Sequence, residues 1–450
     1  MIAARLGKFV SQVRFNDLPE NIISAIKLRL LDTLGVGVAG AQLGLSRPVI
    51  ELFESDSKVA HVWGLSCQAS AREAALANSY ATHGTYLEDG SRFTGGHPSS
   101  VVIPAVFAQA EALHCSGAEL IASTVAGYEV FLRLGRDTYP ANVGRGFQPT
   151  AILAGVSSAA GVARLFGLSP AQAADALAIA ANLGVGMKEA LKSSTTQPLQ
   201  VARGCEGGIV AALLARSGLH GASEVFEKGF LPAFGGSPAS STALLGLGSE
   251  YRISETYLKR HAGCRGNHAP LDVALEVVRQ EQIDPSAIVA MRIAVDTVTL
   301  AASIEAPVNA EQTQFSIGFS VAVALLHGSA SIFQYTDARL QESAVRELMK
   351  KIQVTANPEL DVGYPEKRAA TIEIELLNGK VFKHAVENAR GEPEWPLQSS
   401  EIIEKFFAHT KEVLGTRAQL VHDMVMQIER LDDVSELGKL LTVTQRNNTK

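Results

Sequence analysis

Apolar residues recur at helical spacing almost throughout the first 255 positions, and this periodicity constrains the fold more than any other feature of the chain. The segments expected to be helical are 22–41, 71–83, 102–113, 117–134, 172–183 and 207–216. Ser169 before Pro170 is typical of a helix start, and Gly218 is typical of a helix end. The sequence therefore predicts an all-α domain in which many Ala and Gly residues let helices pack closely.

The periodicity changes near residue 256. Residues 289–296 alternate between apolar and polar positions, which is typical of a strand, and residues 370–387 predict a hairpin around Asn378-Gly379. Helical segments are expected between these strands at 314–326 and 337–350. We therefore expect a second, α+β domain in which helices cover one face of antiparallel strands.

These patterns divide the chain into three parts. A large helical domain is expected over residues 1–255, a smaller α+β lid domain over 256–400, and C-terminal helices that pack back on the helical domain over 401–450. The predicted fold class is therefore mainly α.

The composition narrows the possible partners. With 450 residues, 46% of them hydrophobic, the chain is long enough for two or three domains. Its net charge is −6 and its Lys and Arg residues are scattered, so neither a nucleic acid nor an anionic membrane is an expected partner. No apolar run reaches the roughly 20 residues that a membrane span requires. The cysteines are widely spaced, which argues against a disulfide framework or structural zinc site and favours a reducing cytoplasm.

Two segments concentrate ionisable side chains. The first, residues 259–272, carries Lys259, Cys264, Arg265 and two histidines beside a glycine-containing turn. The second, residues 83–100, carries two histidines and two carboxylates. Titratable groups cluster where proteins bind anions or move protons. These segments are therefore the candidates for a site that binds a small carboxylate.

Short motifs follow one another in a defined order along the chain. They are Leu30-Leu31-Asp32-Thr33-Leu34-Gly35, Trp63-Gly64, Gly96-His97-Pro98-Ser99-Ser100, Gly127-Tyr128-Glu129, Gln314-Phe315-Ser316 and Gly391-Glu392-Pro393-Glu394-Trp395-Pro396-Leu397. In order and spacing these motifs resemble the MmgE/PrpD family over about the whole chain. The resemblance implies a homodimer with its active site in the cleft between a helical domain and a lid. It also implies chemistry on small carboxylates without an obligatory metal or organic cofactor.

The resemblance assigns several residues to the site. The family's histidine in the Gly-His-Pro-Ser motif falls on His97, its lysine before the turn falls on Lys259, and its following histidine falls on His268. Cys264 stands where family members carry Cys or His. We expect Lys259 and Arg265 to pair with substrate carboxylates, and His97 or His268 to carry a proton near neutral pH.

Three positions depart from the ionisable residues of the family. Tyr86 replaces the first aspartate of an acidic motif, and Gln148 and Gln197 replace a histidine and a lysine. Glutamine forms hydrogen bonds but exchanges no proton at neutral pH, which favours a substrate with fewer charges. We hypothesise that Tyr86 has become a proton donor or a ligand for a substrate hydroxyl. Phe319 likewise stands where some members carry an aromatic hydroxyl.

The candidate catalytic residues are His97, Lys259, His268, Tyr86 and Asp89. The candidate substrate-binding residues are Cys264, Arg265, Gln148, Gln197, Arg203 and Glu88. No metal-ligand set is expected. Structural roles stay open for several of them: His97 could bond a backbone carbonyl, Cys264 could be a small buried hydrophobe, and Asp89 could orient His97 or a loop.

The expected function is that of a cofactor-independent, dehydratase-like lyase that removes a proton next to a carboxylate of a small hydroxy- or unsaturated carboxylate. An isomerase or epimerase of a small dicarboxylate would use the same proton abstraction and is the first alternative. A paralogue that binds a carboxylate without turnover is the second. The presence of His97, Lys259 and His268 together argues against this second alternative.

Overall fold

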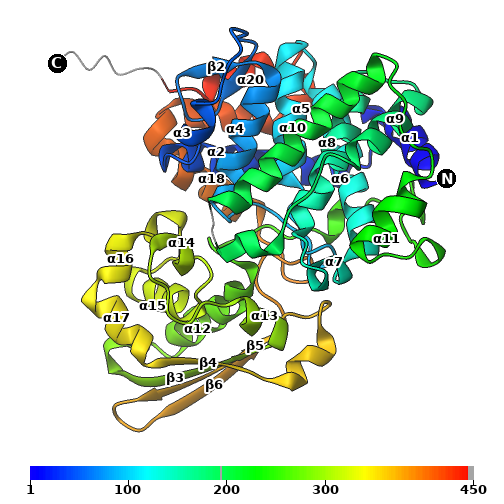
Figure 1. Cartoon of the computed structure of the whole chain (residues 1–450). Helices are drawn as coiled ribbons and strands as arrows, with labels where there is room; N and C mark the ends of the chain where they lie inside the picture. The colour runs from blue at the N-terminus through cyan, green and yellow to red at the C-terminus, as the bar shows by residue number, and fades with distance from the viewer. Residues whose placement is uncertain (193–194, 444–450) are drawn as a thin grey trace. The chain divides into compact units, whose positions relative to one another are not determined.

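The computed structural model of the chain describes residues 1–192 and 195–443, which form two compact units. The helical unit comprises Met1–Thr256 together with the chain from Gln398 onward, and the inserted unit comprises Tyr257–Leu397. The colours of Figure 1 make this division visible, because the helical unit begins in blue and ends in orange and red. The second unit is thus an insertion between two parts of the first.

Helices dominate the helical unit (Figure 1). In chain order they are α1 (Ile2–Gln12), α2 (Glu20–Gln42), α4 (Ala71–Gly84), α5 (Ser99–Ala112), α6 (Gly117–Thr138), α8 (Pro149–Leu165), α9 (Pro170–Ala180), α10 (Thr196–Arg216), α18 (Ser399–Leu414), α19 (Arg417–Met426) and α20 (Ser435–Leu440). Three short helices lie in the connections, namely α3 (Arg47–Ile50), α7 (Ala141–Gly144) and α11 (Leu231–Phe234). The helices predicted from periodicity are confirmed, but α10 begins before the predicted residue 207 because polar residues in its first turns obscure the apolar period.

Local signals set the ends of these helices as predicted. The hydroxyl of Ser169 accepts the backbone N–H of Gln172, and the Gln172 side chain accepts the backbone N–H of Ser169 in return. This reciprocal pair satisfies two amide groups that a helix start leaves open. After α10, Gly218 has φ +92°, a left-handed conformation that strains any residue with a Cβ.

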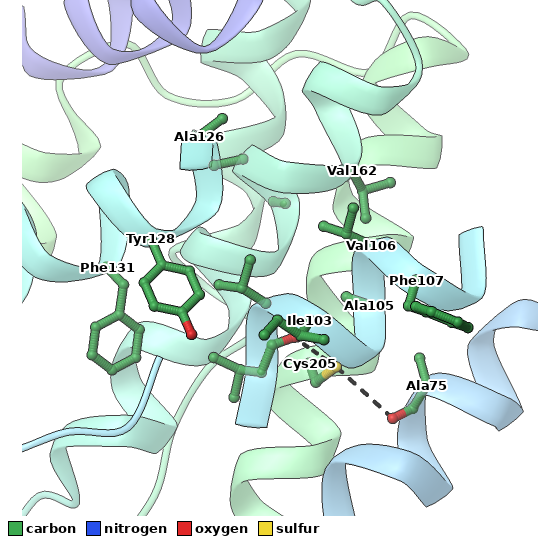
Figure 2. Packing of buried hydrophobic residues seen from close by; sticks show 14 of the residues in the cluster. Ala75, Ile103, Ala105, Val106, Phe107, Ala126, Tyr128, Phe131, Val162 and Cys205 are labelled. Atoms are coloured by element: carbon green, nitrogen blue, oxygen red, sulfur yellow. Dashed lines mark hydrogen bonds between the residues drawn. The ribbon is translucent and has the colours of Figure 1, made fainter. Parts of the chain in front are cut away.

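Helices α8 and α10 approach closely because both present small residues where they meet. A Cβ on Gly208 would lie 2.5 Å from the carbonyl oxygen of Gly155. Beside this contact, Figure 2 shows Cys205 of α10 among buried apolar side chains such as Ile103, with its Sγ directed to the Ala75 carbonyl. Burial raises the pKa of the Cys205 thiol to about 12, so this cysteine is an unreactive core residue.

The helical unit also contains a short hairpin, so the prediction of an all-α domain is wrong in this detail. Strand β1 (Ala60–Val62) pairs antiparallel with β2 (Cys67–Ala69). Gly64, at φ +72°, lies in the turn between them. Strands of three residues are too short to show alternation, which is why periodicity did not reveal them.

A four-stranded sheet forms the base of the inserted unit, in the order β4-β3-β5-β6 (Figure 1). The strands are β3 (Ile288–Val295), β4 (Ile352–Ala356), β5 (Ala370–Leu376) and β6 (Val381–Val386). The predicted hairpin is confirmed, since β5 and β6 pair antiparallel around Gly379 at φ +77°. The predicted antiparallel pairing is also confirmed for β3 with β5, whereas β4, a strand that the sequence did not predict, pairs parallel with β3. A parallel pair requires a crossover, and the helices between these two strands supply it.

Helices cover one face of this sheet. They are α12 (His268–Gln280), α13 (Thr297–Ala302), α14 (Ala310–Thr313), α15 (Ile317–His327), α16 (Asp337–Gln341) and α17 (Ser343–Lys350). Alternate residues of β5, namely Ala370, Ile372 and Ile374, are buried, and α12 contacts both β5 and β6. The extended backbone of Glu342 divides the helix predicted over 337–350 into α16 and α17.

After the inserted unit the chain returns to the helical unit. Helix α18 packs against α2, where a Cβ on Gly35 would lie 3.0 Å from the ring of Phe406. None of the described helices, in either unit, combines the length and the apolarity needed to cross a bilayer.

Candidate active site

The connection between α4 and α5 carries the first group of candidate residues. His83 lies in the last turn of α4, and Tyr86 follows it in the connection. The Tyr86 side chain is buried, and its backbone has φ +50°, a left-handed conformation that bulky residues rarely adopt. Such a conformation costs on the order of 1–3 kcal/mol and persists only where the surroundings impose it. The position of Tyr86 is therefore determined by its contacts.

A buried chain of hydrogen bonds starts at the Tyr86 hydroxyl. This hydroxyl donates to Oε1 of Gln197, 2.7 Å away. Nε2 of Gln197 lies 2.8 Å from Nε2 of His83, and Nδ1 of His83 lies 2.6 Å from a carboxylate oxygen of Glu88. We call Tyr86, Gln197, His83 and Glu88 the buried relay, since all four side chains are shielded from solvent.

The amide of Gln197 determines where His83 carries its proton. Because Oε1 of Gln197 accepts from Tyr86, its amide nitrogen is the atom that faces His83, and an amide nitrogen only donates. Nε2 of His83 must therefore accept, so the imidazole is neutral with its proton on Nδ1. That proton is donated to the Ser100 hydroxyl at 3.1 Å, and the Glu88 carboxylate lies 2.6 Å from the same nitrogen.

His97 lies next to the buried relay, with its ring centroid 5.5 Å from that of His83. Its Nδ1 donates to the backbone carbonyl of Asp89 at 2.6 Å, and a Glu88 oxygen lies 3.9 Å from the same nitrogen. The carbonyl only accepts, so in the neutral ring the lone pair is on Nε2. A histidine held in this way has the orientation of a general base, with the nearby Glu88 carboxylate favouring the protonated product.

Asp89 holds the loop with its carboxylate while its carbonyl holds His97. The carboxylate accepts the backbone N–H of Ser99 at 3.0 Å and the hydroxyl of Tyr128, labelled in Figure 2, at 2.9 Å. Nε of Arg29 lies 3.7 Å away. Burial raises the pKa of Asp89 to about 6, against the lowering effects of Arg29 and of these hydrogen bonds. Asp89 thus serves both structural roles that the sequence left open.

A buried ion pair between α18 and α2 also supports the connection between α4 and α5. Nζ of Lys405, on α18, lies 2.7 Å from Oδ1 of Asp32 on α2, and it donates to the carbonyl of Leu87 at 2.9 Å. Burial raises the pKa of Asp32, and the adjacent Lys405 ammonium partly offsets this effect. The loop that carries Tyr86 and Glu88 is therefore held by residues far away in sequence.

Two candidates of the helical unit have other partners. Oε1 of Gln148 accepts the backbone N–H of Ala151 at 2.5 Å and so caps the start of α8. The Arg203 side chain is 63% exposed and forms an ion pair with Glu206 one turn along α10. Neither side chain bonds to the buried relay through these contacts.

Arg265 is the centre of the second group, which lies in the inserted unit. Its Nε and Nη2 donate to one oxygen of Glu392 at 3.1 and 2.7 Å. Its guanidinium carbon lies 4.3 Å from the ring centroid of Tyr257. A substrate carboxylate would have to compete with Glu392 for this cation, so the paired Arg265 is better suited to orienting its neighbours.

His268, at the start of α12, is one of these neighbours. Nη1 of Arg265 donates to its Nδ1 at 3.0 Å, which places the proton of the neutral ring on Nε2. Within the described parts of the chain, Nε2 has no hydrogen-bond partner of normal geometry, although the ring is fully buried. Burial lowers the pKa of His268 well below its usual value, and the cations Arg265 and Lys259 add to this effect. A hydrogen bond with the Gly263 backbone acts against this lowering of the pKa, so a ligand of the His268 N–H would compete with Gly263.

The other candidates of this group lie on the preceding turn. Lys259 is buried, and its Nζ lies 3.3 Å from the carbonyl oxygen of Gly263. His261 pairs with Asp272 at 3.0 Å, and its ring lies 5.6 Å from that of His268. Cys264 is partly exposed. The structure thus brings all the candidates of residues 259–268 into one cluster.

An aromatic hydroxyl also stands beside Phe319, although that residue has none. The Tyr335 hydroxyl lies 3.1 Å from the carbonyl oxygen of Ala262 and 3.1 Å from the Ser320 hydroxyl. Its ring centroid is 5.7 Å from that of Phe319, and burial raises its pKa well above the usual value. Tyr335 lies in no recognisable motif, so no sequence signal pointed to it, whereas His83 opens a segment that the sequence did single out.

Among residues 1–192 and 195–443, no group of three or more His, Cys, Asp or Glu side chains is arranged to hold a metal ion.

Comparisons with known proteins cover nearly the whole chain. The model of the MmgE/PrpD N-terminal domain matches residues 4–242, and that of the MmgE/PrpD C-terminal domain matches residues 261–429. The cis-aconitate decarboxylase-like protein oryM of Aspergillus oryzae is 26% identical, covering 98% of this chain and 97% of its own length. The cis-aconitate decarboxylase of Aspergillus terreus is 25% identical, covering 98% and 96%. That of Homo sapiens is 26% identical, covering 96% and 92%.

Proposed function

This chain belongs to the MmgE/PrpD family, and on that premise we propose that it is a lyase that acts on a small hydroxy- or unsaturated carboxylate by proton transfer at a carbon next to a carboxylate. Relatives of similar length from Aspergillus terreus and Homo sapiens are cis-aconitate decarboxylases, which supports the lyase class and a small carboxylate as substrate. The proposed reaction uses no organic cofactor.

The observation that carries the proposal is the bond between Nδ1 of His97 and the Asp89 carbonyl. It leaves Nε2 of His97 as the basic atom of the neutral ring. In a dehydration, Nε2 takes the proton from carbon, the electron pair of that C–H bond forms the alkene, and hydroxide leaves and is protonated to water. In a decarboxylation, the C–C bond breaks to release carbon dioxide and its electron pair stays on carbon. His97, protonated from solvent before this step, then donates its Nε2 proton to the resulting carbanion. Either transfer typically contributes roughly 10²–10⁴-fold to the rate.

The proposal gives the inserted unit the task of binding the carboxylate. Lys259 supplies a positive charge, and the neutral His268 supplies an N–H donor through Nε2. Arg265 is a positioning residue, because its bonds to Glu392 and His268 fix the tautomer of that imidazole. Cys264 lines the same turn.

Tyr86 is also proposed as a positioning residue. Its hydroxyl proton is engaged by Gln197, so donation of that proton to substrate would break the buried relay. The relay instead fixes the neutral state of His83 and holds its ring beside Glu88, which lies near His97. Tyr86 and Gln197 are both neutral, which favours a substrate that carries fewer charges at this point.

The test is incubation of the purified protein in D₂O with citrate, alkylcitrates, cis-aconitate, itaconate, malates and amino-dicarboxylates, followed by proton NMR. A lyase gives new alkene signals or, for decarboxylation, a product with one carboxylate fewer and deuterium at the reacting carbon. Loss of C–H signal or a changed diastereomer ratio without elimination would assign an isomerase instead. If no compound changes, the remaining assignment is a paralogue that binds a carboxylate without turnover. Thermal-shift measurements with the same compounds would then show which of them binds.

Active-site variants then test the assignment of the base. His97→Asn keeps a hydrogen bond to the Asp89 carbonyl but has no basic nitrogen, so the turnover number should fall roughly 10²–10⁴-fold. Arg72→Gln is the control, since that side chain is exposed on α4 and belongs to neither group of candidate residues. Equal turnover in the wild type and His97→Asn would refute the assignment.

Two further expectations accompany this proposal. The family resemblance suggests a homodimer, and light scattering after size-exclusion chromatography should then give about twice the chain mass of 47.7 kDa. All four cysteines are free thiols, which suits the proposed location in a reducing cytoplasm.

A further inference from the structure

A depression in the surface of the helical unit has cationic and aromatic walls. Its volume is about 370 Å³, and its lining includes Arg5, Lys8, Phe9, Arg14, Asp17 and Tyr251. This volume lies within the range of sites that bind small metabolites, roughly 300–1,000 Å³. None of its lining residues belongs to the groups around His97 or His268.

Positive charge prevails at this depression although the chain as a whole carries a net charge of −6. Three cationic side chains, Arg5, Lys8 and Arg14, stand against the single carboxylate of Asp17. Arg5 and Lys8 are exposed, three residues apart on α1, and so project from neighbouring positions of one helix face. Neither of them forms an ion pair with any described residue. Their charges are therefore available to an anion.

Buried residues of α6 hold the segment that carries Tyr251, which forms another wall of the depression. Arg133, fully buried on α6, donates to the carbonyls of Leu245 and Glu250, each at 2.6 Å, and to that of Ala243 at 3.2 Å. Glu129 pairs with Arg133 at 3.0 Å. These bonds fix the backbone that leads to Tyr251, so the depression exists before any ligand arrives. A preformed site loses less entropy on binding.

Two rings give the depression an apolar part. Phe9 and Tyr251 are both half-buried, and Phe9 packs against Gly248, where a Cβ would lie 3.8 Å from its ring. Nη1 of Arg14 donates to the carbonyls of Ser11 and Val13 at 2.8 and 3.1 Å, which holds this cation at the rim. The walls therefore combine anion binding with a surface for a planar group.

From these features we propose that the depression is a second ligand site, which binds a small organic anion with at least two negative charges and a planar group. A nucleoside diphosphate has this chemistry. The site is independent of the proposed lyase reaction, because its residues contribute nothing to the groups described above.

The experiment is calorimetric titration of the whole protein at low ionic strength with ADP, pyrophosphate and citrate. ADP should bind saturably, pyrophosphate more weakly because it lacks a ring, and salt should weaken both. The double variant Arg5→Gln/Lys8→Gln should lose at least tenfold in affinity for ADP. The matched control is Arg72→Gln/Lys411→Gln, which removes two exposed cations elsewhere on the helical unit and should leave the affinity unchanged.

Three results would overturn the proposal. The first is the absence of saturable binding of ADP and pyrophosphate to the wild type. The second is equal affinity of ADP for the wild type and for Arg5→Gln/Lys8→Gln, which would place the nucleotide elsewhere. The third is equal affinity for ADP and pyrophosphate, which would remove the planar group from the ligand. Citrate binding that is insensitive to the double variant belongs to another site and counts against a carboxylate ligand here.

Discussion

Gln197 donates its side-chain amide to Nε2 of His83 across 2.8 Å, and this bond keeps the buried imidazole neutral. The amide can act in this way because the Tyr86 hydroxyl occupies its oxygen. Two neutral residues thus decide the protonation of a third.

Gln197→Glu should reverse this arrangement. A carboxylate accepts from Tyr86 and from His83 alike, so His83 should become protonated on both nitrogens between two carboxylates. The ¹⁵N shifts of labelled histidine at pH 7 would show an imidazolium signal that is absent from the wild type. Gln200→Glu, on the same helix, is the control and should leave His83 neutral. A neutral His83 in Gln197→Glu would contradict the assignment of the tautomer.

Tyr86→Phe should lower the turnover number more than it changes KM. The variant leaves the oxygen of Gln197 buried without its hydrogen-bond donor, which costs about 1–3 kcal/mol. The amide group of Gln197 is then free to rotate by 180°, so that its oxygen faces His83. Steady-state kinetics on the substrate identified by NMR would measure both constants. Tyr80→Phe, which removes a hydroxyl bonded to the Thr195 carbonyl, should change neither constant. An unchanged turnover number would remove Tyr86 from the mechanism.

Asp89 should make the wild type lose stability as the pH rises. Its pKa is about 6 in the folded protein and 3.8 without the fold, so the folded state binds the proton more tightly. The stabilising effect is complete below pH 3.8 and is lost as the pH passes 6, by about 3 kcal/mol in total.

Urea unfolding of the wild type and Asp89→Asn between pH 4 and 7.5 would test this prediction. The stability of the wild type relative to the variant should fall across that range. The same comparison with Asp56→Asn, an exposed carboxylate, should give a flat difference. A flat difference for Asp89→Asn as well would show that burial does not shift this carboxyl.

Two ion pairs of the inserted unit allow a test in which distance is constant and burial changes. Arg265 and Glu392 are 2.7 Å apart and buried, whereas Arg292 and Glu373 are 2.7 Å apart and the arginine is 52% exposed. Arg265→Met leaves a buried carboxylate unpaired and should lower the free energy of unfolding by about 3–5 kcal/mol. Arg292→Met should cost less than about 1 kcal/mol.

The second variant of each pair completes the comparison. Adding Glu392→Gln to Arg265→Met should recover part of the lost stability, because it removes the unpaired charge. Adding Glu373→Gln to Arg292→Met should have no measurable effect. Chemical unfolding followed by circular dichroism measures all four, and similar losses for the two arginine variants would contradict the role of burial.

The sequence predicted those features that depend on neighbouring residues. The apolar period found most helices, Ser169 and Pro170 predicted a helix start, and Asn378-Gly379 predicted a hairpin. It did not predict the parallel pairing of β4, because the partner of a strand is chosen across the sheet and leaves no local pattern.

For the candidate site, too, the sequence predicted local features but not contacts between distant residues. The motifs gathered His97, Lys259 and His268 into two segments, and the contacts within each segment are present in the structure. The motifs gave no role to His83 and no sign of Tyr335, since the function of either side chain depends on partners distant in sequence. Arg265 was expected to bind substrate, and its partner Glu392 became visible only in three dimensions.

The bond from Lys405 to the Leu87 carbonyl joins residues 318 positions apart. During synthesis the loop that carries Tyr86 and Glu88 leaves the ribosome long before the helix that supports it. The inserted unit, with all of its own contacts local to residues 257–397, is complete in between. The loop beside His97 therefore gains this support only after the inserted unit has been synthesised, and a nascent chain that stops before α18 has every proposed catalytic residue but lacks the brace that holds this loop.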